Sequence, residues 1–474
     1  MAIFRLLIDG TMYAYKKDTG FAHQLTMTKP GGLRALSAPR ALAAVIIAVR
    51  PNIFNSTVAR GPPNWEESMN TLASVISKPL SPVSEPFVSR LLQYAHAKTA
   101  LDCLAAEIRH MMAPVPPNMS CSQVATSEVK EGVLDGKAIQ RVVMVLRSSG
   151  CVNALKKGSC TMCGHVRGTT RGNEISVSDF KTQIDEELSK FDWAQFPMLC
   201  VYNSGSFLNP DELPIEARDH ILKRISDIHS IRRLVIESRP EFITPSVLDT
   251  LEGTLTNTEL EIGVGLESSD DVVRDLLINK NFTTIDYLNA VSVMRGRRVN
   301  LLTYVLLKSP FLTEREAIDD AQETIEFAFR TGAHIVSIEP VSVQDFTLVH
   351  FLHEVGQFRT PWIWSVIEVL RRTYHLGHIR LGGFEFFPLP SVFVHNCARC
   401  NGSMIQAIRR FNETENIHVF DGLACQCERD WHSDLRKSAD YLPERILATL
   451  AQIDSRIVLE RMVEKFQATN IVTH

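Results

Sequence analysis

The sequence predicts an α/β fold, in which a partial (β/α)6 barrel is followed by a small cysteine-rich metal-binding module. Three observations lead to this prediction. From about residue 140 onward, short apolar runs alternate with amphipathic helical segments, which is typical of repeated strand–helix units and a parallel sheet. Small, acidic or basic residues follow each run, where a barrel builds its site. Seven of the ten cysteines form two groups with the spacing of metal ligands.

Each expected strand is a mostly apolar run bounded by turn residues. Six strands and a seventh candidate are Val142–Leu146, Met198–Tyr202, Arg233–Glu237, Leu260–Leu266, Leu301–Leu307, Ile335–Glu339 and Ile379–Phe387. Helical spacing is found between them at Ser178–Phe191, Ile215–Ile228, Ile285–Met294 and Glu314–Phe329. An open doubly wound sheet would give the same alternation and would also bind ligands at the carboxyl ends of its strands. The pattern therefore leaves both architectures open.

The segments around the barrel differ in composition. The chain is expected to divide into a poorly ordered extension over 1–86, a helical lead-in over 87–135, the barrel over 136–395 and the cysteine-rich module with a terminal helix over 396–474. Asp9 and Asp18 are the only acidic residues among the first 60, against eight lysines and arginines. This composition fits a weakly ordered extension, an upstream start or a transit peptide. Prolines from Pro79 to Pro86 indicate a linker, and helical spacing follows over 87–112.

Composition excludes several classes of protein. The formal net charge of −4 excludes a globally basic nucleic-acid binder but leaves room for a local basic patch. Ten cysteines in 474 residues are too few for a disulfide scaffold and favour a reducing compartment. The longest apolar run, Ala41–Val49, is too short to span a bilayer. We therefore expect a cytoplasmic protein without membrane contact, with organelle targeting by the N-terminal extension left open.

Three cysteines follow the first expected strand. Cys151, Cys160 and Cys163 have the spacing C-x8-C-x2-C, and no fourth cysteine lies nearby. A structural zinc ion takes four protein ligands, whereas a [4Fe–4S] cluster held by three cysteines keeps one iron open for a substrate or cofactor. The count favours such a cluster over the alternatives of zinc or buried thiols.

Charged and small residues follow the later strands. They are the turn Ser204-Gly205-Ser206, the turn with Glu237 and Arg239, then Glu267, Lys308 and Glu339. Any one of them could be an ordinary turn or surface residue. An alternative for Glu237, Arg239 and Glu267 is a mutual ion pair at the mouth of the barrel. His165, Lys308 and Glu339 are candidates for proton transfer, although the sequence does not identify a catalytic acid or base.

The cysteine loop and the three following turns, SGS, ESRP and GLES, resemble the radical S-adenosylmethionine (SAM) enzymes, in the branch of the Elongator radical subunit. The resemblance implies a radical SAM barrel, in which the three cysteines hold a [4Fe–4S] cluster whose free iron binds SAM. It also implies a 5′-deoxyadenosyl radical and a protein electron donor. By resemblance, Ser204, Gly205 and Ser206 would meet the methionine amine. Arg239, beside Glu237 near the cluster, would meet a carboxylate, and Glu267 the ribose.

A second group of cysteines follows the barrel. Cys397, Cys400, Cys425 and Cys427 form two pairs around a predicted helix at Ser403–Phe411. Four thiols without an open position favour a structural zinc site over the alternative of a second iron–sulfur cluster. The remaining cysteines, Cys103, Cys121 and Cys200, are expected to be ordinary buried thiols.

The segment 397–431 resembles the C-terminal part of the radical SAM partner of archaeosine synthase. That resemblance implies a lysine-transferring partner subunit and a tRNA substrate, in which a carbon–nitrogen bond of a lysine adduct of 7-cyano-7-deazaguanine is cleaved to give archaeosine. Arginines that could meet phosphates are Arg167, Arg171, Arg295, Arg297, Arg298, Arg371, Arg372, Arg380, Arg399, Arg409 and Arg410. For each arginine doublet, a solvated helix face is the preferred interpretation, so the tRNA substrate rests mainly on the resemblance. A radical enzyme acting on a small molecule or peptide, and a non-enzymatic metal-binding scaffold, remain alternatives.

Overall fold

The computed structural model describes residues 3–8, 11–16, 22–25, 85–112, 119–156, 158–384 and 387–471. The chain forms two compact units, Met1–His96 and Ala97–His474. The first unit contains an antiparallel three-stranded sheet of β1 (Ile3–Ile8), β2 (Thr11–Lys16) and β3 (Ala22–Leu25). These strands fall within the segment expected to be poorly ordered. The linker predicted to end at Pro86 lies outside the described residues as far as residue 84.

The helix predicted over 87–112 is present as α4 (Glu85–His110). In the second unit its buried side is formed by Leu101, Leu104 and Ile108. Cys103 lies on the other side of this helix and is exposed, so the prediction of a buried thiol is wrong there. Cys121 is half-buried and Cys200 is fully buried.

A single eight-stranded sheet organises the second unit, in the order β11-β10-β9-β8-β7-β6-β5-β4. Its strands are β4 (Thr126–Leu134), β5 (Lys137–Val145), β6 (Met198–Tyr202), β7 (Arg233–Glu237), β8 (Glu259–Glu267), β9 (Val299–Leu307), β10 (Ile335–Pro340) and β11 (His378–Leu381). All neighbours are parallel except β4 and β5. The partial barrel is thus confirmed. The predicted seventh strand is shorter than expected and ends before Gly382.

The antiparallel strand β4 was not predicted from the sequence. Its residues are half-buried or exposed, except for the buried Leu134 at its end. It pairs with β5 through the tight turn at Asp135 and Gly136, both of which have positive φ. An edge strand of this kind has one neighbour and little apolar character, so it lacks the apolar run by which the other strands were found.

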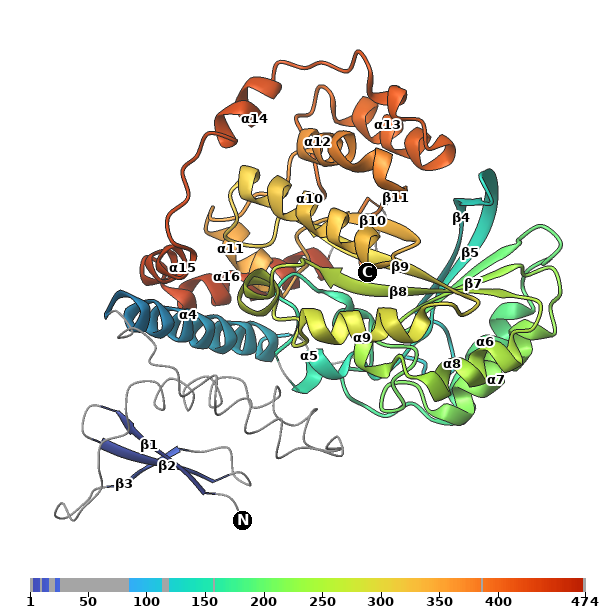
Figure 1. Cartoon of the computed structure of the whole chain (residues 1–474), viewed down its shortest axis with the longest axis horizontal. Coiled ribbons are helices and arrows are strands. Elements are labelled where there is room, and N and C mark those ends of the chain that lie inside the picture. Colours follow the sequence, from blue (N-terminus) through green and yellow to red (C-terminus); the bar gives the residue numbers. More distant parts are fainter. Residues whose placement is uncertain are drawn as a thin grey trace. The chain divides into compact units, whose positions relative to one another are not determined.

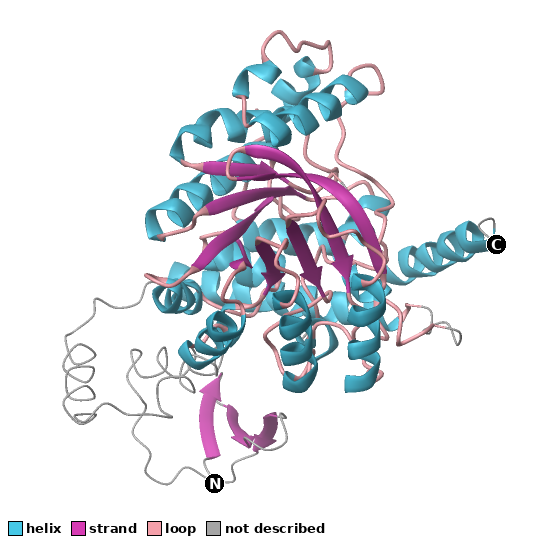
Figure 2. Ribbon diagram, turned by 90° about the vertical axis from the view of Figure 1, so that its right-hand side faces the viewer, coloured by secondary structure: helices cyan, strands magenta, loops and turns pink. Residues whose placement is uncertain are grey.

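Helices cover the outside of the curved sheet (Figures 1 and 2). Between the strands lie α6 (Val177–Leu188), α7 (Ile215–Ser226), α8 (Pro245–Thr254), α9 (Thr284–Met294), α10 (Glu314–Thr331), α11 (Leu348–Glu354) and α12 (Ile363–Thr373). Several begin with a capping box, for example Ser176 with Asp179 in front of α6. The outward side chains Leu234, Ile236 and Ile262 belong to the main core beneath these helices.

The side chains on the inner face of the sheet form a second core, which is apolar at one end of the strands and polar at the other. A small apolar cluster is formed by Leu134, Met198, Cys200, Val235, Leu302 and Ile335. Next to it, the fully buried Glu261 of β8 pairs with Arg380 of β11 at 2.7 Å, across two intervening strands. Glu237, Tyr304 and Glu339 lie further along the strands, toward their carboxyl ends. The inside therefore changes from apolar to polar in the direction of the cysteine loop.

The sheet is open, because β4 and β11 do not pair with each other. Helix α13 (Asn401–Thr414) contacts both of these edge strands. The side-chain amide of Asn412 accepts from the N–H of Leu381 (2.9 Å) and donates to its carbonyl (2.8 Å), as a neighbouring strand would. The chain continues through α14 (Glu428–Asp434), α15 (Leu442–Ala451) and α16 (Ser455–Ile471). The C-terminal segment thus completes one edge of the barrel.

None of the helices in the described part of the chain has the length and apolar character needed to cross a membrane.

Replacing Arg380 with methionine should destabilise the protein by about 3 kcal/mol, because it leaves the buried Glu261 carboxylate without its close partner. Urea denaturation followed by circular dichroism measures this loss. The matched control is Arg224→Met, which breaks a half-exposed pair with Asp185 and should cost at most about 1 kcal/mol. Equal effects of the two substitutions would contradict a structural role for the interior pair.

Candidate active site and cysteine cluster

The loop after β5 carries the three cysteines predicted to hold a cluster. Cys151 precedes α5 (Val152–Lys156), and Cys163 lies just before η1 (His165–Gly168). All three are free and partly buried. Burial raises the pKa of the Cys163 thiol to about 12. Because a metal centre binds the thiolate, occupancy by a metal would replace a proton that this environment otherwise holds.

Side chains from distant parts of the chain hold this loop in place. Arg109, near the end of α4, donates hydrogen bonds to the carbonyls of Ala154 and Gly158. Asn279, at the end of the π-helix η3 (Val273–Ile278), donates from its amide to the Ser159 carbonyl at 2.8 Å. The segment between Cys151 and Cys160 is therefore held in place by side chains from two separate parts of the chain.

Glu212 joins the cysteine loop to the serine turn that follows β6. Its carboxylate accepts from the N–H of Val152 at 2.8 Å, from the N–H of Ser206 at 2.5 Å and from the Asn209 amide at 3.0 Å. A Cβ atom at Gly205 would overlap this carboxylate and come within 3.3 Å of the Cys151 Cα atom. Only glycine fits there, so the predicted Ser204-Gly205-Ser206 turn lies directly against the first cysteine.

A second link joins the serine turn to the turn after β7. The Arg239 N–H donates to the Ser206 hydroxyl at 3.1 Å, and the Phe207 N–H donates to the Glu237 carbonyl at 2.8 Å. Asn203, the residue before the serine turn, is fully buried, and neither atom of its amide has a hydrogen-bond partner in the described structure. Buried amides rarely lack partners, so this position favours contact with a bound group.

The three charged residues predicted at the barrel mouth do not pair with one another. Glu267 binds the ammonium group of Lys280 at 2.5 Å, and Glu237 accepts from the Tyr304 hydroxyl at 2.8 Å. The mutual ion pair considered from the sequence is therefore absent among these three.

Arg239 is occupied by the protein itself. Its Nε donates to Glu241 at 2.6 Å, and its terminal nitrogens donate to the carbonyls of Lys280 and Asn281. The guanidinium also lies over the Phe282 ring, 5.4 Å from its centroid. In this arrangement it shapes the loop after β8, and three of its five N–H groups are engaged by the protein.

Two acids near the carboxyl end of the barrel are protonated more readily than usual. Burial raises the pKa of Glu237 to about 7 and that of Glu339 to about 8. Among the described residues, the hydrogen-bond partner of the Glu339 carboxylate is the Ser337 hydroxyl, which donates at 2.6 Å. Neither acid has an ion pair with a basic residue in the described structure, which is why burial dominates.

The other two candidates for proton transfer have structural partners. Lys308 forms a buried ion pair with Glu314 and lies 5.9 Å from the centroid of the Phe358 ring. Burial lowers the pKa of His165, whose ring bonds the Phe387 backbone. Glu339 is therefore the more available proton holder of the three predicted residues.

Five residues of this region were not predicted from the sequence: Arg109, Glu212, Asn279, Lys280 and Tyr304. None of them directly follows a strand, which is the position that indicates a site residue in a barrel sequence. Glu212 comes six residues after Ser206, Lys280 lies in a loop beyond a π-helix, and Arg109 precedes the barrel. Tyr304 lies within β9, where it reads as an ordinary strand aromatic. A carboxylate shortly after the serine turn was the one signal that could have been followed.

The second cysteine group converges in space. The sulfur atoms of Cys397, Cys400, Cys425 and Cys427 all lie within 4.8 Å of one another. The sulfur–sulfur distances are 3.7 Å for Cys397–Cys400, 3.6 Å for Cys397–Cys425 and 3.7 Å for Cys400–Cys427. The indole N–H of Trp364 in α12 donates to the Cys427 sulfur at 3.4 Å. These four residues can bind one metal ion. The hydrogen bond from Trp364 joins the cysteine group to helix α12.

Replacing Arg109 with alanine should lower the amount of iron that the protein takes up on anaerobic reconstitution, measured per chain by a colorimetric iron assay. It removes two charge-assisted hydrogen bonds to the cysteine loop, each worth about 1.5–3 kcal/mol. Arg298→Ala is the matched control, because Arg298 also donates to two backbone carbonyls but at a different place. Unchanged iron content in the Arg109 variant would show that the loop holds its shape without this residue.

Replacing Glu339 with glutamine should change how stability depends on pH. The folded pKa of about 8 lies above the ordinary value of 4.5, so the native acid loses stability as pH rises from that value toward 8. The variant should therefore exceed the wild type in melting temperature at pH 9 and match it near pH 4.5. Each pKa unit corresponds to about 1.4 kcal/mol. An exposed acid, Glu174→Gln, is the control, and parallel pH profiles for wild type and E339Q would refute the assignment.

Comparison with known proteins gives a consistent set of relatives, although no protein-family model matches the chain. Archaeosine synthase subunit beta from Methanosarcina acetivorans is 33% identical over 328 residues, which cover 67% of this chain and 90% of that protein. Archaeosine synthase subunit beta from Thermococcus kodakarensis is 28% identical over 307 residues, with coverage of 62% and 92%.

Among solved structures, methylornithine synthase aligns with a TM-score of 0.38 and 12% identity, over 60% of this chain and 74% of that one. Elp3 from Methanocaldococcus infernus aligns with a TM-score of 0.36 and 15% identity, over 50% and 59%. The family is shown by the sequence relationship, since the match to the Methanosarcina protein extends over 90% of its length. The chain belongs to the archaeosine synthase subunit beta family of radical SAM proteins.

Proposed function

We propose that this protein is a radical SAM carbon–nitrogen lyase that acts on tRNA carrying a lysine adduct of 7-cyano-7-deazaguanine and leaves archaeosine. The observation that carries the proposal is the contact between the three-cysteine loop and the Ser204-Gly205-Ser206 turn, made through Glu212 and Gly205. The name of the Methanosarcina relative supports the choice of substrate.

Cys151, Cys160 and Cys163 would hold a [4Fe–4S] cluster. The residues fit such a group, because the thiols are free and partly buried, and their loop is held by Arg109 and Asn279. When bound, a cluster with an open iron together with SAM supplies a 5′-deoxyadenosyl radical. Reduction of the cluster calls for a protein electron donor.

The residues around the cysteine loop would bind and orient SAM. The serine turn lies beside Cys151 with the unpartnered amide of Asn203 next to it in the chain, so Ser204, Gly205 and Ser206 are suited to the methionine end. Glu267 and Glu237 are suited to hydroxyl or amino groups, and Lys280 orients Glu267. Arg239 acts through the loop it supports.

Glu339 would hold or accept a proton beside the reacting substrate. It lies at the carboxyl end of β10, with no basic partner in the described structure, and burial raises its pKa to about 8. A protonated acid in a partly buried site can donate a hydrogen bond at neutral pH, and it can ionise when a cationic group such as an ammonium approaches.

The four C-terminal cysteines would bind a structural zinc ion. A tetrahedral zinc site with Zn–S bonds of about 2.3 Å has sulfur atoms about 3.8 Å apart, close to the distances of 3.6 and 3.7 Å between these sulfurs. Four irons of a cluster would occupy separate corners and hold the sulfurs farther apart. The ligand set is closed, which favours a structural role over a catalytic one.

The proposed reaction requires two macromolecular partners: the tRNA and a subunit that first transfers lysine to the base. The relative's description as a beta subunit supports an assembly of this kind for that protein.

The reconstituted protein should convert the lysine adduct in tRNA to archaeosine, detected by nucleoside mass spectrometry, and should form 5′-deoxyadenosine when supplied with SAM and dithionite. Cys160→Ala should abolish both products, because two cysteines cannot hold the cluster. Cys103→Ala, at an exposed thiol, is the matched control.

The possible outcomes separate the alternatives. A colourless protein that forms no 5′-deoxyadenosine would indicate a metal-binding scaffold. An active cluster that leaves the adduct unchanged would point instead to a small-molecule or peptide substrate.

Replacing Cys425 with alanine should reduce bound zinc from one ion per chain toward none and lower the melting temperature. Elemental analysis and calorimetry measure the two effects. Cys121→Ala, at a half-buried thiol outside the group, is the control. Iron in place of zinc in the aerobically purified protein would favour the second cluster over the zinc site.

A further inference from the structure

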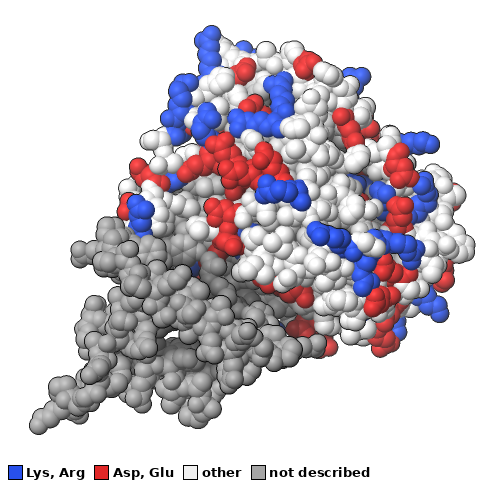
Figure 3. Space-filling model, in the orientation of Figure 1, with Lys and Arg blue, Asp and Glu red and all other residues white. Residues whose placement is uncertain are grey.

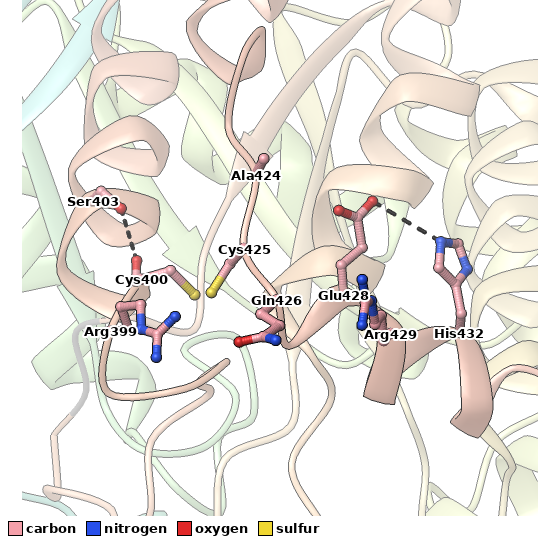
Figure 4. A pocket seen from close by; sticks show the side chains of 9 residues that line it. All are labelled: Arg399, Cys400, Ser403, Ala424, Cys425, Gln426, Glu428, Arg429 and His432. Atoms are coloured by element: carbon pink, nitrogen blue, oxygen red, sulfur yellow. Dashed lines mark hydrogen bonds and ion pairs between the residues drawn. The ribbon is translucent and has the colours of Figure 1, made fainter.

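A solvent-open cavity lies beside the four C-terminal cysteines, and no step of the proposed reaction uses it. It has a volume of about 760 Å³ and is lined chiefly by polar residues: Arg399, Cys400, Ser403, Ala424, Cys425, Gln426, Glu428, Arg429 and His432. Figure 4 shows Arg399 on one side of the cysteines, with Arg429 and His432 on the other. Two separate chain segments therefore bring basic side chains to one hollow.

The cysteines fix the spacing of the two arginines. Arg399 stands between Cys397 and Cys400, and Arg429 follows Cys427 by two residues. Because the four sulfurs lie together, both arginines extend from backbone that a bound metal would make rigid. A cavity with preorganised cations needs little reorganisation when it binds an anion.

Several acids of this module have basic partners, whereas the two arginines have none among the described residues. Glu415 pairs with His378, Asp421 with His418 and Asp434 with Lys437. The side chains of Arg399 and Arg429 are exposed, and in the described structure neither forms an ion pair or a hydrogen bond. Glu428, the acid in the lining of the cavity, lies 4.0 Å from the His432 ring, so the two guanidinium groups are left available to an anion from outside.

Most other arginines singled out from the sequence are already engaged. Arg167 pairs with Asp345, Arg297 with Asp249, Arg372 with Glu368 and Arg380 with Glu261. Figure 3 shows basic side chains gathered over the upper part of the molecule, where the C-terminal module lies. Arginines at the cavity are thus better placed to meet an anion than those that stabilise the barrel.

We propose that this cavity binds the phosphate backbone of the RNA substrate, with Arg399 and Arg429 contacting phosphates. The inference rests on the proposed tRNA substrate and adds the surface that holds it. The planar guanidinium suits bidentate contact with phosphate oxygens, and Gln426, Ser403 and His432 add polar groups to the same hollow. A solvent-open cavity also fits a polymer that continues past it.

Balancing the charge of a metal–thiolate centre is the competing role for these arginines. In the described structure, the Trp364 indole and the backbone N–H groups of Arg399 and Cys400 donate to the sulfurs, whereas neither guanidinium does. This placement favours an external anion over the thiolates.

The test measures binding of the RNA substrate to the full-length protein by fluorescence anisotropy at several salt concentrations. The double variant R399Q/R429Q should bind the tRNA about tenfold more weakly at low salt. Its plot of log affinity against log salt should be shallower by about 1–2. The matched control is Arg295→Gln, an exposed arginine without an ion pair in the described structure, at the end of α9. Zinc content, measured in parallel, reports whether the module is intact.

Three results would decide the matter. Wild-type binding and salt dependence in a zinc-containing double variant would overturn the inference while leaving the proposed reaction untouched. Failure of the wild type to bind tRNA would overturn the proposed substrate itself. If the double variant loses zinc, hydrogen exchange on the wild-type protein decides: tRNA should slow exchange in 397–403 and 425–432, and protection confined to other segments would overturn the inference.

Discussion

The buried carboxylate of Glu212 joins the two loops on which the candidate site depends. It accepts from backbone N–H groups on both sides, one in the cysteine loop and one in the serine turn. A carboxylate can do this because it offers several acceptor positions and no donor. Parallel strands bring the loops to the same edge of the sheet, but this contact sets their distance. Gly205 leaves the room that the contact needs.

Two of the charged residues at the barrel mouth form ion pairs with neighbouring side chains. Lys280 forms an ion pair with Glu267, and Glu241 forms one with Arg239. Among the described residues, the partners of Glu237 and Glu339 are the hydroxyl groups of Tyr304 and Ser337. The site therefore contains two ion pairs at the mouth of the barrel and two acids whose protonation can respond to a bound ligand.

More of the fold than of the candidate site could be predicted from the sequence. Buried parallel strands are nearly continuous apolar runs, so β6 and β7 were found to the residue, whereas the half-exposed strand β4 has no such run. The C-terminal cysteines were found as one group because their ligand spacing is local. Arg109, Glu212 and Lys280 were missed because long-range packing, which no short motif records, brings them to the cysteine loop. For Arg239, the residue type suggested a ligand contact, but the neighbouring carbonyls that occupy it could not be read from the chain.

Helix α13 has a consequence beyond the cysteines that precede it. An open sheet presents unpaired N–H and carbonyl groups at both edges, and such edges pair readily with strands of other molecules. Here α13 contacts β4 and β11, and the Asn412 amide satisfies both backbone groups of Leu381. The cysteine-rich segment thus covers strand edges that could otherwise pair with other chains. If a metal bound by the four cysteines fixes this segment, its loss would uncover the sheet, and solubility would then depend on metal content through a single helix.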